Sequence, residues 1–101
     1  MILKKIRECV DKKNIKWSKH CLKRMLEREI SRADVLNCIM NGDTIKDYPN
    51  DTPFPSCLIF GYTLEDKVIH VVASVDNEFA FIITTYYPDL NYFNEALKTR
   101  R

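Results

Sequence analysis

The stretch that decides the fold is residues 57–87, which read CLIFGYTLEDKVIHVVASVDNEFAFIITTYY. It contains three runs rich in β-branched and aromatic residues, and each run is long enough to form a strand. The segments between the runs are short and polar, which is typical of antiparallel hairpins. The predicted strands are residues 57–63, 68–75 and 79–87.

The residues before this stretch predict one more strand and three helices. The strand covers residues 44–48, where apolar and polar side chains alternate before Pro49, and a loop with two prolines follows it. The first helix covers residues 2–13 and is broken by Asn14 and the extended residues 15–17. The second begins at the N-cap Ser18 and ends at Arg28 or Glu29; the third begins at the N-cap Ser31 and stops at Gly42. A last short helix is predicted from Asp89 or Asn91, with Tyr92, Phe93, Ala96 and Leu97 on its apolar side.

This order of elements predicts a single α+β domain over residues 1–101. N-terminal helices would pack on one face of a four-stranded antiparallel meander, and the short C-terminal helix would follow. The composition, 46% hydrophobic and 30% charged, is that of a soluble globular domain. No apolar run approaches the roughly 18 residues of a membrane span, and no export signal is evident, so we predict a cytoplasmic protein without a membrane partner.

The cysteines and glycines argue against a bound cofactor or metal. The four cysteines, Cys9, Cys21, Cys38 and Cys57, form no CxxC pair, so we predict reduced thiols that pack as small hydrophobes. Only two glycines are present, which excludes glycine-rich phosphate loops. We therefore predict no cofactor and no metal site.

Charge is distributed unevenly along the chain. Residues 1–32 carry a net charge of +7, and residues 33–101 carry −5. A basic segment in an otherwise acidic domain is typical of a surface that binds a polyanion. The alternative is that charged helices simply present their outer faces to water.

The second helix carries the most specific charged pattern. His20, Arg24 and Arg28 recur every four residues, so they form one stripe along the helix, and Lys19 and Lys23 lie close to it. Two guanidinium groups beside an imidazole can hold a phosphate next to a group that titrates near neutral pH. The alternative is a solvated face in which the arginines pair with Glu27 or Glu29.

The second histidine, His70, lies in the middle of a predicted strand. The loop lengths predict a register in which Gly61 and Thr84 lie opposite His70, and Tyr86 lies opposite Val68. A polar side chain in such an apolar run needs a partner. It is either a functional group or a core histidine that is hydrogen-bonded to Thr84 or to a backbone carbonyl.

A set of short motifs adds a resemblance to a known family. In order, they are Trp17-Ser18-x-His20-x-x-x-Arg24-Met25-x-Glu27-Arg28-x-Ile30, Asn41-Gly42, Tyr48-Pro49, Pro55-Ser56, Gly61, Ile69-His70-Val71-Val72, Ile83-Thr84-Thr85-Tyr86, Pro88 and Arg100-Arg101. Over about residues 15–101 they resemble the bacterial family called domain of unknown function 4258. The resemblance implies a relative of the RelE/ParE-type toxins and of the barnase/colicin/RelE-like nuclease fold. Relatives often have a partner antitoxin, which for this family is often a small zinc-finger type.

The resemblance and the residues together favour a toxin-like, metal-independent endoribonuclease that produces a 2′,3′-cyclic phosphate. Its base and acid would be His20 and His70, provided that the second helix lies across the His70 face of the sheet. Arg24 and Arg28, with Lys19 and Lys23, would bind the RNA phosphates, and Thr84 and Tyr86 would orient the substrate. Two alternatives stay open: a non-catalytic module that docks an antitoxin or RNA, and a gyrase-directed toxin of the ParE type.

Overall fold

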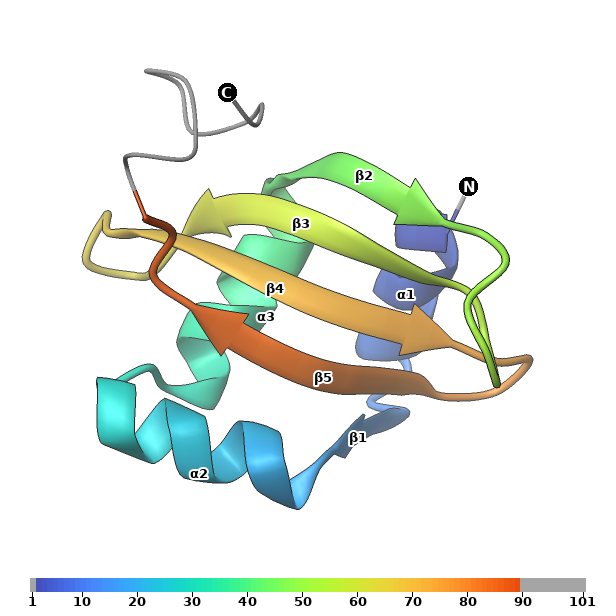
Figure 1. The fold of residues 1–101 in the computed structure, drawn as a ribbon, viewed down its shortest axis with the longest axis horizontal. Coiled ribbons are helices and arrows are strands. Elements are labelled where there is room, and N and C mark those ends of the chain that lie inside the picture. Colours follow the sequence, from blue (N-terminus) through green and yellow to red (C-terminus); the bar gives the residue numbers. More distant parts are fainter. Residues whose placement is uncertain (1, 90–101) are drawn as a thin grey trace.

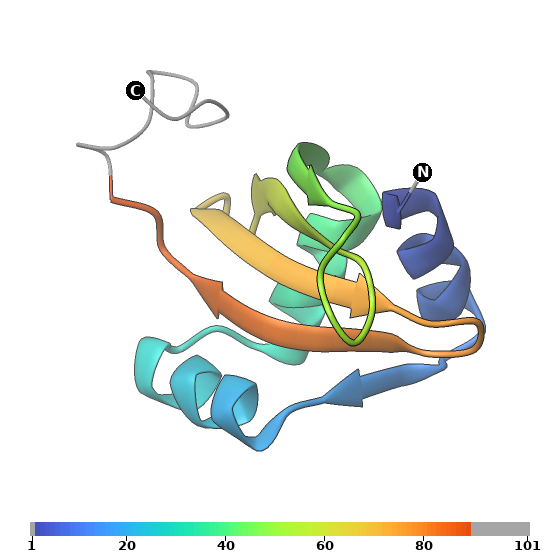
Figure 2. The same cartoon turned by 45° about the vertical axis from the view of Figure 1, so that its right-hand side comes forward.

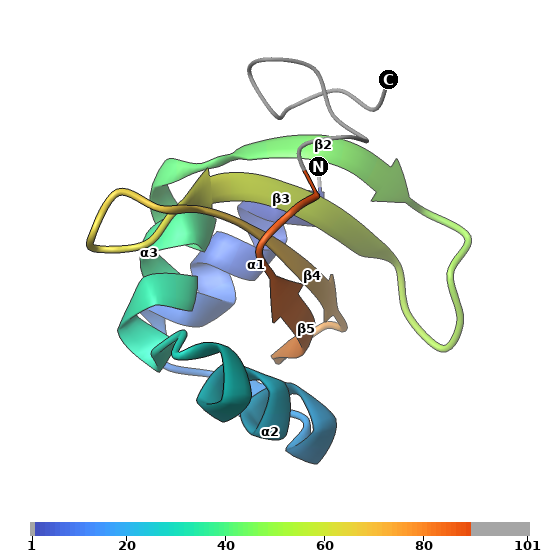
Figure 3. The same cartoon turned by 60° about the vertical axis from the view of Figure 1, so that its left-hand side comes forward.

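Of the three helices that the structure describes, two cover one face of a β-sheet and the third lies along its edge (Figure 1). The structure is a computed structural model that describes residues 2–89. The elements are α1 (Ile2–Asp11), β1 (Ile15–Trp17), α2 (Lys19–Arg28), α3 (Arg32–Asn41), β2 (Asp43–Tyr48), β3 (Ser56–Tyr62), β4 (Val68–Val75) and β5 (Ala80–Tyr86). α1 and α3 pack on the sheet face, whereas α2 packs beside β5 (Figure 3). The helix predicted from Asp89 or Asn91 lies outside the described residues.

The sheet has five strands in the order β1-β5-β4-β3-β2, so the predicted four-stranded antiparallel sheet is wrong. The additional strand, β1, runs parallel to β5 and places Ile15 opposite Ala80 and Trp17 opposite Ile82. A three-residue segment is too short to show an alternating pattern, and its partner is far away in the sequence. Ala80 and Ile82 are buried, and the backbone polar groups of buried residues need partners, which β1 supplies.

The helix ends follow local sequence signals, as predicted. The Ser18 side chain accepts a hydrogen bond from the Cys21 N–H and caps α2. Ser31 caps α3 in a capping box, because its hydroxyl accepts from the Asp34 N–H while the Asp34 carboxylate accepts from the Ser31 N–H. None of the helices within residues 2–89 is long and apolar enough to cross a membrane.

The hydrophobic core lies between the sheet and the two helices that cover it. Its fully buried members come from all of these layers: Ile6, Val35, Cys38, Ile39, Cys57, Ile59, Ile69, Val71 and Ala73. All four cysteines are buried with free thiols, as predicted. Burial raises the pKa of Cys38 and of Cys57 to about 12, so both thiols stay neutral and behave as apolar core groups.

Gly42 and Gly61 allow α3 to approach β3 closely. A Cβ atom on Gly42 would lie 2.1 Å from the Phe60 carbonyl oxygen, and one on Gly61 would lie 2.7 Å from the Cys38 Sγ and 2.9 Å from its Cα. Neither glycine has a positive φ. Both positions therefore need glycine because there is no space for a Cβ atom. α3 could not pack this close to β3 if either residue carried a side chain.

The predicted register of His70 is wrong on both sides. His70 lies opposite Phe60 on β3 and opposite Tyr86 on β5, while Gly61 faces Ile69 and Thr84 faces Val72. Three features account for the shift. The β3–β4 turn has three residues, 64–66, rather than two, and the β4–β5 turn has four, 76–79, rather than three. The β4–β5 register also shifts by one residue beside Ile83, which has no pairing partner.

Candidate functional site

α2 is fixed against the second half of β5 by three contacts with backbone carbonyls. The Ser18 N–H donates to the Ile82 oxygen at 3.4 Å, and the Ser18 hydroxyl donates to the Ile83 oxygen at 3.3 Å. At the other end of the helix, Arg28 donates to the Thr85 oxygen. α2 therefore runs in the same direction as β5. We name the surface formed by His20, Arg24 and Arg28 together with residues 83–86 the α2–β5 edge.

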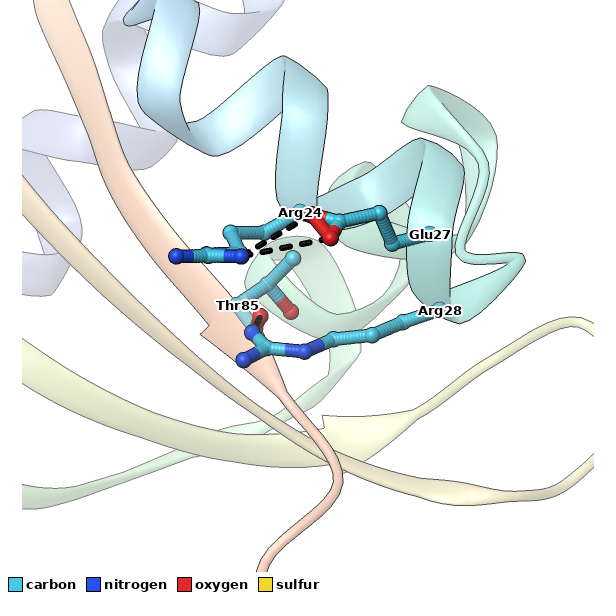
Figure 4. Close-up of polar contacts among 4 residues, drawn as sticks. All are labelled: Arg24, Glu27, Arg28 and Thr85. Carbon is cyan, nitrogen blue, oxygen red and sulfur yellow. Dashed lines mark hydrogen bonds and ion pairs between the residues drawn. The ribbon is translucent and has the colours of Figure 1, made fainter.

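Arg28 reaches the strand rather than a carboxylate. Its Nη1 donates to the Thr85 carbonyl oxygen at 2.8 Å (Figure 4). This bond uses one of the five N–H groups of a guanidinium and neutralises none of its charge. The predicted alternative, in which Arg28 pairs with Glu27 or Glu29, is not what the structure shows. A carbonyl contact holds the cation in place and leaves donors for an anion.

Arg24 follows the alternative reading and pairs with Glu27. Its Nη1 donates to the two carboxylate oxygens at 2.9 and 3.2 Å, and both side chains are well exposed. An exposed ion pair of this kind contributes about 0–1 kcal/mol, so an incoming phosphate can displace the carboxylate. Figure 4 shows that both guanidinium groups extend from α2 toward β5. Arg24 and Arg28 thus present two cations on the same side of the helix.

The remaining charged residues of α2 are exposed. They are Lys19, His20 and Lys23, all on the first two turns. By its spacing, Leu26 belongs to the apolar side of this helix together with Cys21 and Met25. It is nevertheless 84% exposed. The buried side of α2 is consequently narrow and consists of Cys21 and Met25.

His70 is fully buried on the sheet face opposite α1 and α3. Its ring makes edge contacts with Phe60 and Tyr86, at centroid distances of 6.3 and 5.5 Å. His20, by contrast, is exposed on the first turn of α2. α2 packs beside β5 at the edge of the sheet rather than across the His70 face, so the structure does not show the arrangement that the predicted His20–His70 pair requires.

Thr85 connects the α2–β5 edge to His70, and the sequence analysis missed it. Its carbonyl oxygen accepts from Arg28, while its buried hydroxyl donates to the His70 carbonyl oxygen at 2.9 Å. The predicted partner of His70, Thr84, is half-buried opposite Val72. The register shift beside Ile83 places Thr85, instead of Thr84, in contact with the backbone of His70.

Tyr86 follows Thr85 on β5, and its ring packs against His70 on the sheet face opposite α1 and α3. Its side chain is half-buried, and burial raises its pKa, as does the nearby Tyr48. The phenol is therefore neutral at physiological pH and acts as a hydrogen-bond donor. This end of β5 thus carries the Arg28 cation at its edge and a neutral donor on the adjoining sheet face.

A hollow lies at the end of the sheet that is farther from the Arg28–Thr85 contact. It has a volume of about 400 Å³ and lies between α1, the 49–55 loop and the β4–β5 turn. Its polar lining residues are Lys5, Asp47, Asp76 and Asn77, and none of the predicted site residues lines it. Within residues 2–89, no three potential metal ligands of the His, Cys, Asp or Glu type gather at one point.

Comparison with known proteins gives one match. Residues 17–87 match the family model described as "Domain of unknown function (DUF4258)", a range that includes α2, α3, strands β2 to β5, the last residue of β1 and every residue of the α2–β5 edge. No curated protein and no solved structure matches the chain.

Proposed function

The chain belongs to the domain of unknown function family DUF4258, and from this premise we propose that it is a toxin-like endoribonuclease that cleaves RNA without a metal ion. The proposal includes a relationship to the RelE/ParE-type toxins, a cytoplasmic location and an antitoxin protein as partner, of the zinc-finger type. Buried, reduced thiols are in keeping with the reducing cytoplasm. The α2–β5 edge is the proposed site.

One observation carries the proposal: Arg28 is held by the Thr85 carbonyl oxygen, beside an Arg24 that is engaged only in an exposed ion pair. A phosphodiester needs two properties from its site, positive charge and several N–H donors in fixed positions. A guanidinium anchored on a neutral oxygen supplies both. The exposed imidazole of His20 lies on the same stripe, one helical turn before Arg24.

The proposed reaction needs one base, cations on the phosphate and a donor for the leaving group. His20 takes the proton of a ribose 2′-hydroxyl, and the 2′-oxygen attacks the adjacent phosphorus. The P–O2′ bond forms and the P–O5′ bond breaks, which gives a 2′,3′-cyclic phosphate. The 5′-oxygen takes a proton from water, and the imidazolium of His20 neutralises the hydroxide. Arg24 and Arg28 hold the phosphate, and Tyr86 donates a hydrogen bond to the 5′-oxygen.

In this scheme His70 is a positioning residue, not the general acid of the sequence-based hypothesis. It is fully buried, so it does not reach a phosphate at the α2–β5 edge. Its ring packs against Tyr86, and its carbonyl oxygen accepts from Thr85. It thereby fixes the strand segment that carries the leaving-group donor.

The test is cleavage of single-stranded RNA by the purified protein in excess chelator, with analysis of product ends. We expect 2′,3′-cyclic phosphate ends. His20→Ala should lower the rate by about 10²- to 10⁴-fold, the usual contribution of a general base. Arg28→Ala should lower it strongly, and Arg24→Ala should weaken RNA binding and reduce its salt dependence, because one phosphate contact is lost. Lys4→Ala removes the same charge from the exposed side of α1 and serves as the control.

A second candidate function has one observation in its favour. Because His70 is buried, only one imidazole is exposed at the α2–β5 edge, and a binding surface needs none. A non-catalytic module that docks RNA would bind RNA with the same dependence on Arg28 but leave it intact. RNA binding without cyclic phosphate ends would therefore replace the endoribonuclease with this module.

A further inference from the structure

The sheet face that α1 and α3 leave uncovered carries a ring stack built by a loop. The 49–55 loop folds over this face toward β5 (Figure 2). It places Phe54 on Phe81 with parallel rings, at a centroid distance of 5.7 Å and an interplanar angle of 2°. Phe81 lies between the buried core residues Ala80 and Ile82, so its side chain points to the opposite face.

A cation lies beside the rings. The Lys16 ammonium, on the neighbouring strand β1, is 4.6 Å from the ring centre of Phe79 and 6.0 Å from that of Phe81. The carboxylate of Asp76 interacts electrostatically with this ammonium. Its pKa is lowered mainly by hydrogen bonds from the backbone N–H groups of Phe79 and Glu78, and Lys16 adds to the effect. Both bonds end on Asp76 Oδ1, and within residues 2–89 Lys16 forms no ion pair, so its ammonium can meet an anion.

Phe54 is an unusual choice for its position. It is 37% exposed and belongs to a loop, where its ring adds nothing to the core cluster. The same ring also lines the 400 Å³ hollow next to Lys5 and Asn77, both of which carry N–H donors. An exposed ring with stacked and cationic neighbours is typical of sites that bind flat, electron-rich groups.

The position of the stack relative to the α2–β5 edge indicates which flat group. Phe81 and Thr85 lie on the same strand, four residues or about 13 Å apart. Lys16 and Arg28 therefore place positive charge at both ends of β5. A single nucleic-acid strand repeats a flat base and a negative phosphate, and it matches this alternation of rings and cations.

We propose that Phe54, Phe81 and Lys16 form a base-stacking platform that makes the protein selective for single-stranded RNA. The inference rests on the proposed function and adds the substrate class. A base stacks on Phe54, its phosphate meets Lys16, and the strand continues along β5 to Arg28. Bases in a duplex are stacked on each other and have no free face, so a duplex gains only the phosphate contacts.

The experiment compares two 2′-O-methyl oligonucleotides of equal length, which cannot be cleaved because they lack the nucleophilic hydroxyl. One carries adenines and the other is abasic, so both present the same phosphates. Stacking on an aromatic side chain predicts that the wild-type protein binds the adenine strand roughly 5- to 150-fold more tightly. Phe54→Leu should abolish this preference, and Phe54→Trp should keep it and show fluorescence quenching on binding. Thermal melting verifies that both variants are folded.

The outcomes separate the platform from the proposed function. Equal affinity for the two strands, or an unchanged preference in Phe54→Leu, overturns the platform and leaves RNA cleavage standing. If neither strand binds while RNA is still cleaved, the platform is again wrong. If the protein neither binds nor cleaves RNA, the proposed function fails and the platform fails with it, and a protein partner is then the occupant of this face.

Discussion

The two faces of the sheet are built on different physical principles. The face under α1 and α3 carries aliphatic and thiol side chains, among them Ile59, Ile69 and Cys57, and a glycine where α3 comes closest. The opposite face carries rings and polar groups, among them His70 and Tyr86. On the first face, the available volume determines which side chains fit. On the second face, hydrogen bonding and ring geometry determine it.

This difference predicts on which face a substitution changes stability and on which it changes binding. On the helix-covered face, a change in side-chain volume meets close-packed neighbours and lowers the free energy of unfolding. On the opposite face, the same change meets partly exposed rings, and the polar groups determine what can bind. A residue on the second face can therefore be important for function with little effect on stability, provided that it is not buried.

The largest effect is expected for Gly61→Val, which tests the volume limit of the first face. The new side chain would overlap Cys38, whose Sγ and Cα lie 2.7 and 2.9 Å from the position of a Cβ. Overpacking of this severity costs about 3 kcal/mol or more of unfolding free energy. Urea denaturation measures it.

The matched control is Val72→Ile on β4, which adds volume to the half-buried side of the opposite face. We expect a change below about 1 kcal/mol, since the face has room for a methyl group. Similar losses for the two variants would mean that the faces do not differ in the way described here.

An intermediate loss of stability is expected for His70→Gln, which tests the role of a buried polar residue on the second face. The variant loses the ring contacts with Phe60 and Tyr86, and we expect it to lower the unfolding free energy by about 2 kcal/mol. The rate of RNA cleavage per folded molecule should fall only modestly, because Tyr86 loses its ring partner. The shape of the pH profile should stay unchanged, because His70 exchanges no proton in the reaction.

The counterpart is His20→Gln. This exposed residue should change stability by no more than about 0.5 kcal/mol while the cleavage rate collapses. Loss of one limb of the pH–rate profile in His70→Gln would return His70 to the reaction as an acid or base.

A smaller loss of stability than for His70→Gln is expected for Asp34→Asn, which removes a link between α3 and the sheet. Asp34 Oδ2 accepts from the Ser31 N–H and Oδ1 accepts from the Leu64 N–H in the β3–β4 turn. Burial raises the pKa of Asp34, but these hydrogen bonds outweigh burial and hold it below the usual value. An asparagine has one acceptor oxygen and can keep only one of the bonds, so we expect a loss of about 1 kcal/mol at pH 7.

The difference in stability between the wild type and Asp34→Asn should depend on pH in a defined direction. A carboxyl group whose pKa is lowered by folding stabilises the protein above its unfolded pKa of about 3.9, and the contribution disappears as the pH falls through the folded value. Urea denaturation at pH 7 and near pH 3 should therefore show a difference between wild type and variant that shrinks in acid. A difference that grows in acid would contradict the assignment.

The sequence predicts the parts of the fold that depend on neighbouring residues. Ser18, Ser31 and Gly42 mark the helix ends because capping is a local interaction, and α3 begins and ends beside its predicted caps. The strand ranges follow from composition in the same way. The pairing of β1 with β5 depends on residues far apart in the chain, and three residues carry too little pattern to reveal it.

The candidate site was predicted only in part, for a related reason. The spacing of Arg24 and Arg28 on α2 is local and could be read directly. The partners of His70 required a register across two hairpins, and one extra residue in each turn together with the shift beside Ile83 moved every neighbour. The role of Thr85 and the stack of Phe54 on Phe81 depend on that register and on a loop conformation that the sequence does not specify.

The parallel pairing of β1 with β5 also sets an order of events during synthesis. Sixty-five residues separate Ser18 from the Ile83 carbonyl oxygen that it contacts. A ribosome releases α2 long before β5, so a nascent chain that ends before Tyr86 has the cationic helix but no strand to anchor Arg28. The α2–β5 edge is therefore assembled late, only after β5 has been synthesised and released.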